Sequence, residues 1–491
     1  MLYIGADLGT SSLKLLLVND KGEILNSVTR DYPLIFPRPG WCEQDANEWW
    51  NAFVPAVKSL LDGHDLDEVK AIGLGGQMHG LVILDDKDEL IRPVILWNDG
   101  RTDEETEYLN NVIGKDRLAE YTGNIAFAGF TAPKLLWMKE HEPENFSRIS
   151  KIMLPKDYIN YLLTGVHSCD YSDASGLLLL DVKNRCWSRE MLEICSVRED
   201  QLPKLFESYE VTGTIKKEVA ELLGLPCDVK VIAGAGDNAA AAVGTGTVGD
   251  GACNISLGTS GTIFTSSSKF AIDPMNSLHA FAHADGTYHL MGVLLSAASC
   301  NKWFCEEILG TDDFNHEQEG MEETLGKNNI FFLPYLMGER SPINDTYARS
   351  LFIGMSMDTS RRDMVQAVLE GVGLCVRDCV EVSRKIGVDI KRSKLCGGGA
   401  KSPVWRKIIA NVLDIPIDIP VTEQGPGYGA AMLCMVGTGL YKDVKDCADA
   451  LIHVKETVYP DPELVAAYDR MYEKHKLLYP ALKDFYEVMN R

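Results

Sequence analysis

The tetrapeptide Leu-Gly-Thr-Ser occurs twice in this chain, at residues 8–11 and 257–260. Each copy follows an apolar run that predicts a strand, residues 2–6 before the first copy and 252–255 before the second. A Gly-Thr-Ser turn between two strands leaves backbone N–H groups and two hydroxyl groups without a ladder partner, and such groups can bind phosphate oxygens. Two such turns in one chain predict two related lobes that hold one polyphosphate from both sides.

The residue that precedes each tetrapeptide differs, being Asp7 in the first copy and Ser256 in the second. A carboxylate at this place could hold a phosphate-bound Mg²⁺ through water, whereas a serine could not. The alternative is that Asp7 only caps a turn. We favour the interpretation in which Asp7 binds a metal. A phosphate-bound metal in turn indicates a nucleotide, and therefore phosphoryl transfer. Lys14, just beyond the first turn, is either a phosphate ligand or a solvated lysine.

The segment Gly-Ala-Gly-Asp-Asn-Ala at residues 234–239 follows a predicted strand, 229–233, and opens a predicted helix. It matches the dinucleotide-binding pattern, but the next strand runs into Ser256 rather than ending in an acid for the ribose. A second interpretation makes Asp237 a helix N-cap. We favour a third, in which Asp237 accepts the proton of a substrate hydroxyl as it attacks a phosphorus. Asp7 and Asp237 are the candidate metal ligands.

Two short polar segments offer groups that suit a neutral polyol, whose hydroxyls need donors and acceptors together. Residues 77–79 supply an amide, an apolar contact and an imidazole on a glycine-rich loop, although a lone histidine is more often buried and satisfied. Residues 97–101 supply an aromatic ring, an amide, an acid and a guanidinium, a density that is also found in plain turns. The candidate substrate-binding residues are Gln77, Met78, His79, Trp97, Asn98, Asp99 and Arg101.

Two other motifs have competing interpretations. Three glycines at residues 397–399, before a predicted helix, would let an adenine or ribose approach the backbone, or they form only a tight strand–helix turn. His279, His283 and His289 have a spacing typical of metal ligands. However, residues 284–287 predict a hairpin turn, and no acidic or cysteine partner completes a zinc site, so we expect no metal there.

Strands alternate with helices through both halves of the chain, which predicts an α/β fold. After the glycine-rich stretch 244–251 the strand–turn–strand order of the N-terminus starts again, so we interpret this stretch as a hinge between two domains, 1–247 and 248–491. The predicted strands of the two repeats are residues 2–6, 13–18 and 24–29, and then 254–257 and 262–265.

Capping residues predict where several helices begin. Pro55 is expected to kink or shorten the first of these helices, and the chain from Asp461 onward is expected to form a helical tail. The predicted starts are Asp45 with Glu48, Ser360 with Asp363 for a long helix ending near Gly387, and Ser402 with Pro403.

Composition narrows the class of protein. At 491 residues the chain is too long for one core, so we expect two or three domains. A formal net charge of −23 argues against nucleic acids and acidic membranes as partners, because these bind Lys/Arg surfaces. Thirteen cysteines without any Cys-x-x-Cys pair, and the lack of a signal peptide or a long apolar run, predict a cytoplasmic protein.

Over nearly its whole length the chain resembles the FGGY carbohydrate kinases. Within that family, residues 77–80, 95–101, 154–158, 172–176 and 338–342 are most similar to the members that act on D-xylulose. The motifs that carry the family resemblance are Asp7-Leu-Gly-Thr-Ser-Ser, Ser256-Leu-Gly-Thr-Ser-Gly, Cys396-Gly-Gly-Gly-Ala and the signature stretches 129–137 and 354–371.

This resemblance implies two actin-like, ribonuclease-H-type α/β domains around a central cleft, the first for sugar and the second for nucleotide, commonly assembled as a homodimer. It implies that Met78, His79 and Asn238 contact sugar and that Asp237 is the catalytic base. It places Trp303 by the nucleotide, while adenine contacts at Ser402 vary in the family. The expected nucleotide-binding residues are Thr10, Ser11, Ser12, Lys14, Gly258, Thr259, Ser260, Trp303, Gly397, Gly398, Gly399, Ala400 and Ser402.

The resemblance also implies an activity, the ATP- and Mg²⁺-dependent phosphorylation of D-xylulose at its 5-hydroxyl. One alternative is another kinase of the family, acting on ribulose, gluconate, glycerol or a deoxyhexulose. Alternatives from other classes are an actin-like ATP-binding protein that senses sugar without phosphorylating it, and a nucleotide-dependent dehydrogenase that uses the loop at residues 234–239.

Overall fold

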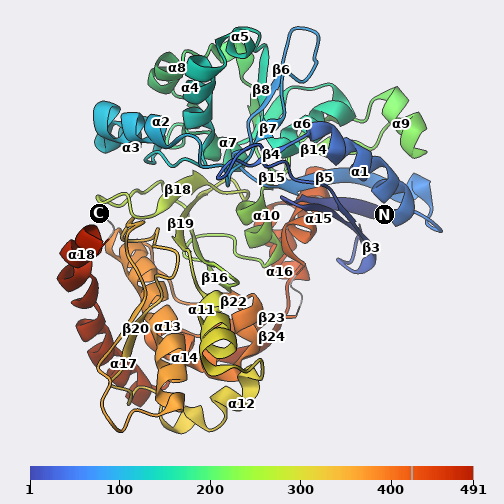
Figure 1. The fold of residues 1–491 in the computed structure, drawn as a ribbon. Coiled ribbons are helices and arrows are strands. Elements are labelled where there is room, and N and C mark those ends of the chain that lie inside the picture. Colours follow the sequence, from blue (N-terminus) through green and yellow to red (C-terminus); the bar gives the residue numbers. More distant parts are fainter. Residues whose placement is uncertain (422–423, 490–491) are drawn as a thin grey trace.

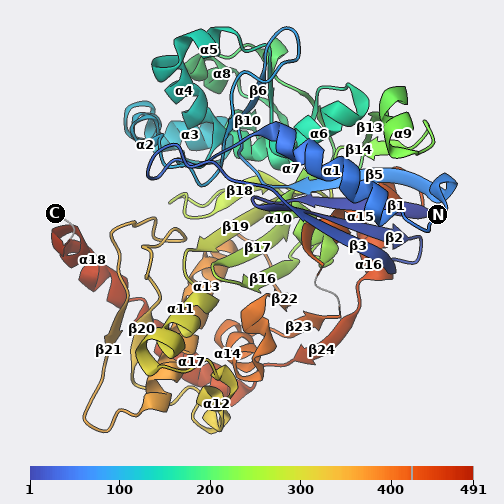
Figure 2. The same cartoon turned by 45° about the vertical axis from the view of Figure 1, so that its right-hand side comes forward.

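The computed structural model describes residues 1–421 and 424–489 of the chain. Within these residues the chain forms two lobes, which lie one above the other in Figures 1 and 2, and each lobe is built on a seven-stranded sheet. Helices and strands alternate through both lobes, as the predicted α/β class requires.

The first sheet begins with three antiparallel strands, β1 (Leu2–Leu8), β2 (Ser12–Asn19) and β3 (Ile24–Asp31). β5 (Val69–Gly76) pairs in parallel with β1, and β14 (Lys230–Ile232) pairs in parallel with β5. The strand order is therefore β3-β2-β1-β5-β14, with β13 (Val211–Thr214) at the far edge. The three strands predicted at the N-terminus are confirmed.

The second sheet repeats this arrangement. β16 (Cys253–Leu257), β17 (Gly261–Ser267) and β19 (Tyr288–Leu294) are antiparallel neighbours. β22 (Ser393–Cys396) and β23 (Ile417–Pro420) then extend the sheet in parallel on the other side of β16. The order β19-β17-β16-β22-β23 matches that of the first lobe, and the two Leu-Gly-Thr-Ser segments join equivalent strand pairs.

Helices cover both faces of the first sheet. α1 (Ala46–Leu60), α6 (Pro155–Thr164) and α9 (Lys217–Leu223) share one hydrophobic core with the sheet. α10 (Asp237–Gly244), α15 (Gly425–Gly437) and α16 (Val444–Leu451) form the core on the other face. α15 and α16 come from the part of the chain that the predicted division at residues 247/248 assigns to the second domain, so the chain returns to the first sheet near its end.

α10 and α15 lie side by side at the junction of the lobes (Figures 1 and 2). Small residues make this close approach possible, because a Cβ atom at Gly429 would clash with the Ala240 carbonyl, and one at Gly244 would lie 2.8 Å from the Gly425 oxygen. A Cβ at Gly5 on β1 would likewise clash with α15 at Gly427. The glycines of α15 therefore let it pack against a helix and a sheet at once.

The predicted helix starts can be compared directly with the structure. Asp45 caps α1, and Ser360 with Asp363 forms a reciprocal capping box at the start of α13 (Arg361–Lys385), both as predicted. Pro55 does not end α1, which continues to Leu60. Pro55 lies on the exposed side of the helix, where water can replace the backbone hydrogen bond that proline cannot donate.

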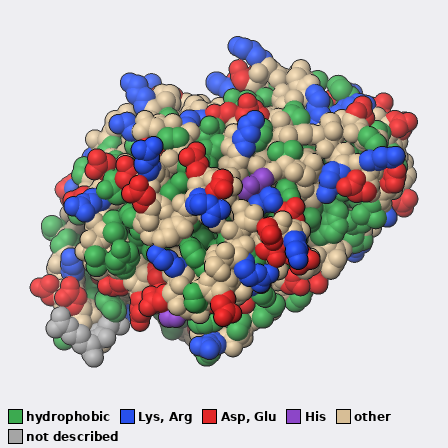
Figure 3. Space-filling model, turned by 90° about the horizontal axis from the view of Figure 1, so that it is seen from above, with side chains coloured by type: hydrophobic (Ala, Val, Ile, Leu, Met, Phe, Trp, Pro, Cys, Tyr) green, Lys and Arg blue, Asp and Glu red, His purple; other side chains and the backbone are tan. Residues whose placement is uncertain are grey.

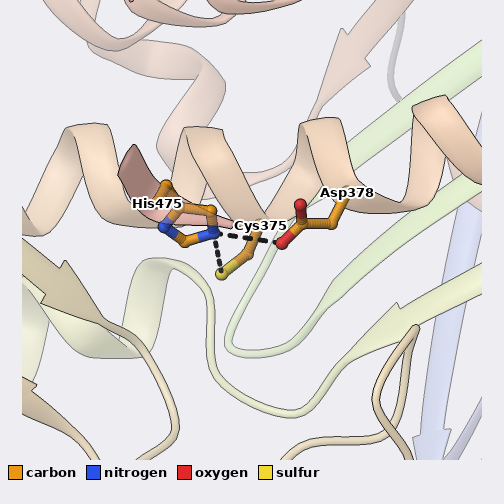
Figure 4. Close-up of side chains that lie close together, drawn as sticks. All are labelled: Cys375, Asp378 and His475. Atoms are coloured by element: carbon orange, nitrogen blue, oxygen red, sulfur yellow. Dashed lines mark hydrogen bonds and ion pairs between the residues drawn. The ribbon is translucent and has the colours of Figure 1, made fainter. Parts of the chain in front are cut away.

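The second lobe packs around α13 and α14 (Pro403–Leu413), and the predicted helical tail consists of α17 (Pro462–His475) and α18 (Leu478–Met489). Figure 4 shows one contact that attaches this tail. The imidazole Nε2 of His475, at the end of α17, lies 3.0 Å from the Asp378 carboxylate and 3.9 Å from the Cys375 sulfur, both on α13. This polar contact is buried against α13 and links the tail to the lobe.

A further set of short helices and strands forms the upper part of the first lobe in Figure 1 and packs onto β18 (His279–Ala282) of the second sheet. The side chain of Asn124 bonds to both the N–H and the C=O of Ala280, at 3.0 and 2.8 Å, as a neighbouring strand would. The two lobes are therefore joined here as well as at α10 and α15.

The remaining elements are short. In the first lobe they are β4 (Glu43–Gln44), η1 (Leu66–Glu68), β6 (Val82–Leu84), β7 (Val94–Ile95), α2 (Asp103–Glu107), η2 (Tyr108–Gly114), α3 (Lys115–Thr122), α4 (Thr131–His141), α5 (Pro143–Ser147), β8 (Lys151–Met153), β9 (Ser168–Asp170), α7 (Tyr171–Ala174), η3 (Ser175–Leu177), β10 (Leu180–Asp181), β11 (Cys186–Trp187), α8 (Arg189–Cys195), η4 (Glu199–Gln201), β12 (Lys204–Phe206), β13 (Val211–Thr214) and β15 (Ala235–Gly236). In the second lobe they are α11 (Ala298–Trp303), η5 (Phe304–Leu309), α12 (Phe314–Gln318), η6 (Met321–Glu323), β20 (Phe331–Leu333), β21 (Leu351–Ile353), η7 (Gly398–Lys401) and β24 (Val454–Val458).

The surface is mixed in charge. On the face drawn in Figure 3, lysine and arginine side chains are scattered among acidic ones rather than gathered in one patch. Among the described residues, no helix combines the length and the apolar character that crossing a membrane requires. All thirteen cysteines are free thiols, and most of them are buried.

Candidate active site

The first Gly-Thr-Ser turn lies at the end of β1 and is held from several sides. Within the turn, the Gly9 N–H donates to the Ser12 carbonyl at 2.9 Å. The Tyr32 hydroxyl donates to the Gly9 carbonyl, and the Trp97 indole N–H donates to the Thr10 hydroxyl at 3.0 Å. Ser11 is exposed. The predicted residues Thr10 and Trp97, 87 positions apart, are thus brought together at this turn.

The second turn, at the end of β16, is fixed to the start of α11. The carbonyls of Gly258 and Thr259 accept hydrogen bonds from the N–H groups of Ala298 and Ala297, at 2.8 and 2.9 Å. The side chains of Thr259 and Ser260 are exposed, as phosphate ligands would need to be. Because α11 ends at Trp303, the turn and this predicted nucleotide contact belong to one connected unit.

The glycine loop at residues 397–399 lies against the second turn. β22 pairs with β16, and a Cβ atom at Gly397 would lie 2.8 Å from the Leu257 carbonyl oxygen. At Gly398 an added Cβ would meet nothing within 4 Å, so this glycine borders open space that a nucleotide could enter. Ala400 is buried just behind the loop.

Ser402 caps α14, as predicted from its position before Pro403. Its hydroxyl oxygen accepts the Trp405 N–H at 3.1 Å and lies 2.5 Å from the Gln318 amide oxygen. The hydroxyl is therefore occupied by internal partners, which supports a structural role at the helix start.

Asp7 and Asp237 lie near the ends of two strands, β1 and β15, that flank β5. In the sheet, Gly75 of β5 is paired with Asp7 of β1 on one side and with Ala235 of β15 on the other. Asp237 follows β15 at once and is the first residue of α10. A Cβ atom at Gly75 would lie 3.0 Å from the Ala240 Cβ, so the absence of a side chain there lets α10, which carries Asp237, lie close against β5.

The interpretation of Asp237 as an N-cap is wrong. Gly236 occupies the cap position, and no side chain caps α10. Instead, one carboxylate oxygen of Asp237 accepts the backbone and side-chain N–H groups of Asn238, at 2.7 and 2.8 Å. The second oxygen is left for a ligand on the partly exposed side of the residue.

The two acids disfavour each other's charge. Burial, and next the charge of Asp237, raise the pKa of Asp7 to about 7, while Lys14 acts in the opposite direction. Burial raises the pKa of Asp237 to about 6, against the two hydrogen bonds from Asn238. Two carboxylates in this state favour a cation between or beside them, and oxygen ligands suit Mg²⁺. The Lys14 ammonium donates to the Gln424 amide oxygen at 2.9 Å.

His79 has one of its ring nitrogens free for a ligand. Its backbone is in the left-handed region, with φ of 70°, and its ring stacks on Phe130. Burial lowers the pKa of His79 to about 3, so the imidazole is neutral. Nδ1 lies 2.8 Å from the Gly176 carbonyl oxygen and must therefore carry the proton. Nε2 then presents a lone pair, which can accept a hydrogen bond from a sugar hydroxyl.

Gln77 and Met78, which precede His79, are both buried but contact different parts of the site. Met78 is buried, and its side chain would touch a Cβ placed at either Gly176 or Gly236, so it packs between the loops that carry His79 and Asp237. Gln77 is also buried, and its amide N–H groups reach the Gly9 carbonyl and the Gln44 side chain, both at 3.3 Å. Gln77 therefore supports the first phosphate turn.

The segment 97–101 divides into an exposed and a buried pair. Trp97 and Asn98 are exposed. The side chains of Asp99 and Arg101 are fully buried and form two parallel hydrogen bonds with each other, at 2.8 and 2.7 Å. The Arg101 guanidinium also lies 3.8 Å above the Trp41 ring. We infer that Asp99 and Arg101 hold the turn in place, while Trp97 and Asn98 are the residues available to a ligand.

Two buried lysines of the site were not identified from sequence. Lys134 donates to the carbonyls of His79 and Gly129, at 2.7 and 2.8 Å, and burial lowers its pKa to about 7. Lys156 lies among three aspartates beneath β15. Lysine is rarely buried, and only the similarity of the segments 129–137 and 154–158 to a family pointed to them.

The histidines at 279, 283 and 289 pack with aromatic rings, as Phe264 stacks on His289 at 4.1 Å between ring centres. Burial lowers the pKa values of His279 and His289 well below their usual range. In the described part of the chain, groups of three His, Cys, Asp or Glu side chains close enough to share a metal ion lie elsewhere, at Cys375 with Asp378 and His475, and at Glu105 with Glu140 and His141.

Comparisons with known proteins agree with this geometry. Residues 2–244 match the model of the FGGY family of carbohydrate kinases, N-terminal domain, and residues 253–438 match that of the C-terminal domain. A xylulose kinase of Escherichia coli strain K12 is 40% identical over 484 residues, which is 98% of this chain and 99% of the relative.

Solved structures show the same likeness over the whole chain. A xyloylose kinase from Brucella ovis has a TM-score of 0.94 at 39% identity, covering 99% of this chain and 100% of that one. A gluconate kinase from Lactobacillus acidophilus has a TM-score of 0.94 at 29% identity, covering 99% of both chains. These matches confirm the predicted fold class of two α/β domains of the sugar kinase type.

Proposed function

Because the chain belongs to the FGGY family of carbohydrate kinases, and is therefore a phosphotransferase with ATP as donor and an alcohol as acceptor, we propose that it phosphorylates D-xylulose at its 5-hydroxyl. The products would be D-xylulose 5-phosphate and ADP. The observation that carries the chemistry is the free carboxylate oxygen of Asp237 beside the loop of Met78 and His79. Similarity over 98% of the chain to a relative named xylulose kinase supports the choice of sugar.

Asp237 would act as the catalytic base. Its carboxylate accepts the proton of the 5-hydroxyl while that oxygen bonds to the γ-phosphorus and the bond to the β,γ-bridging oxygen breaks, which releases ADP. Phosphoryl transfer needs little other covalent chemistry from the protein. Asn238 holds one oxygen of the carboxylate and so orients the other toward the acceptor.

The sugar would be held by groups with fixed donor and acceptor roles. The Nε2 lone pair of His79 would accept a sugar hydroxyl. The exposed Trp97 lies against the first turn, where its indole N–H donates to Thr10, and Asn98 is exposed beside it. The amide of Asn238 lies beside the base. Such a set distinguishes hydroxyl positions, because an analogue without the matching hydroxyl leaves a polar group unpaired.

The nucleotide would lie between the lobes, with its phosphates on the two Gly-Thr-Ser turns and its adenosine near Gly398 and Trp303. Asp7, with Asp237 close by, would hold a phosphate-bound Mg²⁺, which neutralises phosphate charge when bound. Closure of the lobes about residues 244–251 would exclude water and so limit hydrolysis of ATP without sugar.

ADP release measured over a panel of acceptors tests this proposal. We expect D-xylulose to give a kcat/KM at least about tenfold above that of D-ribulose, D-gluconate, glycerol and a deoxyhexulose, since one unmatched hydroxyl costs on the order of a hydrogen bond or more. Phosphorus NMR of the product should show a phosphate monoester on the terminal carbon. A higher kcat/KM for another acceptor would assign the chain to a different substrate.

The gluconate kinase with the same fold makes D-gluconate the main competing acceptor. Gluconate carries a carboxylate, which would need a cation in the sugar pocket. The Arg101 guanidinium is already paired with Asp99 and Glu43, whereas the charge of Arg340 acts on His79, so the acceptor panel has to decide between the two sugars. A homodimer and a cytoplasmic location, which the family resemblance and composition predict, are further parts of the proposal.

A further inference from the structure

A charged cluster is completely buried beneath the strand that leads to Asp237. The Lys156 ammonium lies 2.5 Å from Asp157, 2.8 Å from Asp170 and 3.4 Å from Asp173, and all four side chains are inaccessible to solvent. Lys156 belongs to α6 and lies directly against β5, since a Cβ atom at Gly76 would be 3.0 Å from the Lys156 Cβ. The cluster therefore touches the strand that separates the two catalytic acids.

The cluster is connected to the active site through Asp170. One oxygen of its carboxylate pairs with Lys156, and the other accepts the hydroxyls of Ser172 and Ser208, at 2.5 and 2.7 Å. The same oxygen accepts the Ser172 N–H at 2.8 Å, so that the Asp170 carboxylate caps the short helix α7 (Tyr171–Ala174). Asp170 thus binds two serines by their hydroxyls, but the onward contacts of those serines differ.

Ser172 extends the connection to the residue before Asp237. While its hydroxyl donates to Asp170, its oxygen accepts the Gly236 N–H at 3.1 Å. Four residues later, the Gly176 carbonyl lies 2.8 Å from the His79 Nδ1 and fixes which ring nitrogen carries the proton. The segment 172–176 therefore holds both the backbone that precedes the base and the imidazole that faces the sugar.

Charge explains why this arrangement should be rigid. An isolated ammonium would be very costly at this depth, so Lys156 can stay buried only with its carboxylates arranged around it. These carboxylates raise the pKa of Lys156 well above its usual value, which keeps it charged. Within the cluster, Asp170 is the member held from most sides, by Lys156, by two serine hydroxyls and by the Ser172 N–H, and buried hydrogen bonds of this kind fix the positions of the groups that make them.

We propose that the Lys156–Asp170 pair is a positioning device, which acts through Ser172 on Gly236 and so on the carboxylate of Asp237, and through Gly176 on His79. This proposal rests on the proposed function, because the residue that the cluster positions is the base that would accept the proton of the sugar hydroxyl. Lys156 and Asp170 touch neither the sugar nor the nucleotide. Their role is to hold the Asp237 carboxylate and the His79 imidazole in fixed positions relative to each other.

The variants Ser172→Ala and Ser208→Ala provide the test. Each removes one buried hydroxyl from Asp170, and Ser172→Ala keeps the backbone N–H that caps α7. Only Ser172→Ala also removes the acceptor of the Gly236 N–H. We expect Ser172→Ala to lower kcat about five- to tenfold, as expected for one hydrogen bond, with KM for sugar and for ATP within about twofold. Ser208→Ala should keep kcat within about twofold while losing similar thermal stability.

The outcomes separate the positioning role from simple support. Equal kcat values in the two variants, at comparable melting temperatures, would overturn the proposal and leave the cluster as a folding element. A rise in KM with unchanged kcat in Ser172→Ala would also overturn it, since substrate binding rather than the base would then be affected. If wild-type protein showed no sugar-dependent ADP release, the proposed function itself would fail, which is a different result.

Discussion

The environment of Asp237 favours its proposed role as a base but lowers the stability of the folded protein. Burial raises the pKa of its carboxyl from 3.8 to about 6, so near neutral pH the folded protein carries a charge that it would hold more easily when unfolded. The same elevated pKa makes the carboxylate a better proton acceptor than an ordinary aspartate. Burial of Asp237 therefore lowers the stability of the folded protein and raises the basicity of the carboxylate.

The substitution Asp237→Asn should therefore stabilise the protein above about pH 6. The folded state binds the proton more tightly than the unfolded state, so wild-type stability falls as the pH rises from about 4 to about 6. Asparagine removes this penalty, and we expect a gain on the order of 1 kcal/mol at pH 8, reduced because the group is partly exposed. The gain should vanish near pH 4.

Thermal or urea unfolding of the two proteins at pH 4 and pH 8 measures this difference. A variant that is less stable than wild type at pH 8 would show that the carboxylate is not strained. In the wild-type kinase, kcat/KM should rise with pH through about 6, as Asp237 loses its proton.

Residue types indicated which groups the site could contain but not which of them were already paired. Asp7, Asp237 and His79 were identified from sequence, and the structure leaves each of them with an atom free for a ligand. Asp99 and Arg101 were equally polar candidates, yet they satisfy each other. Pairing depends on distances between segments, which no local pattern contains. The buried Lys156 carried no signal of its own for the same reason.

At the scale of elements, the packing of α10 against α15 links the base to the junction between the lobes. α10 starts with Asp237, and its residues Ala240 and Gly244 touch the glycines of α15. Any change that pushes these helices apart would move Asp237 as well. Backbone atoms form the contact, so the neighbours cannot yield by rotating a side chain.

The substitution Gly429→Ala tests this contact. The added methyl group would clash with the Ala240 carbonyl and lie 2.9 Å from the Gly244 nitrogen. We expect a loss of at least about 2 kcal/mol in unfolding free energy, from overpacking, together with a lower kcat. The control is Gly373→Ala in the interior of α13, where the nearest atom is the Ile408 side chain at 3.2 Å. There the change should stay within about 1 kcal/mol. Equal melting temperatures for the two variants would contradict the account.

Capping signals located the helices well, because a cap is a local hydrogen bond between residues three apart. Ser360 with Asp363 and Ser402 with Pro403 mark the observed starts of α13 and α14. The return of α15 to the first sheet was not predictable in this way. Its small residues suit close packing, but the sequence does not say against which partner.

The whole molecule consists of two lobes with the same strand order, each presenting a Gly-Thr-Ser turn between equivalent strands. The duplication was visible in the sequence because the turns need the same residues in both lobes. The acids differ because only one lobe carries Asp7, and the base follows the last parallel strands of the first sheet, at β15. Under the proposed function, the repeated turns would bind phosphate from both lobes, while the two acids of the first lobe would carry out the chemistry.

The measurement that tests this account most directly is sugar-dependent ADP release by wild type and Asp237→Ala, at matched occupancy by ATP. We expect turnover with D-xylulose to fall by at least about a thousandfold in the variant, as loss of a general base predicts, while ATP affinity changes only a few-fold and the protein stays folded. Turnover in Asp237→Ala above about a tenth of the wild-type rate would contradict the assignment of the base.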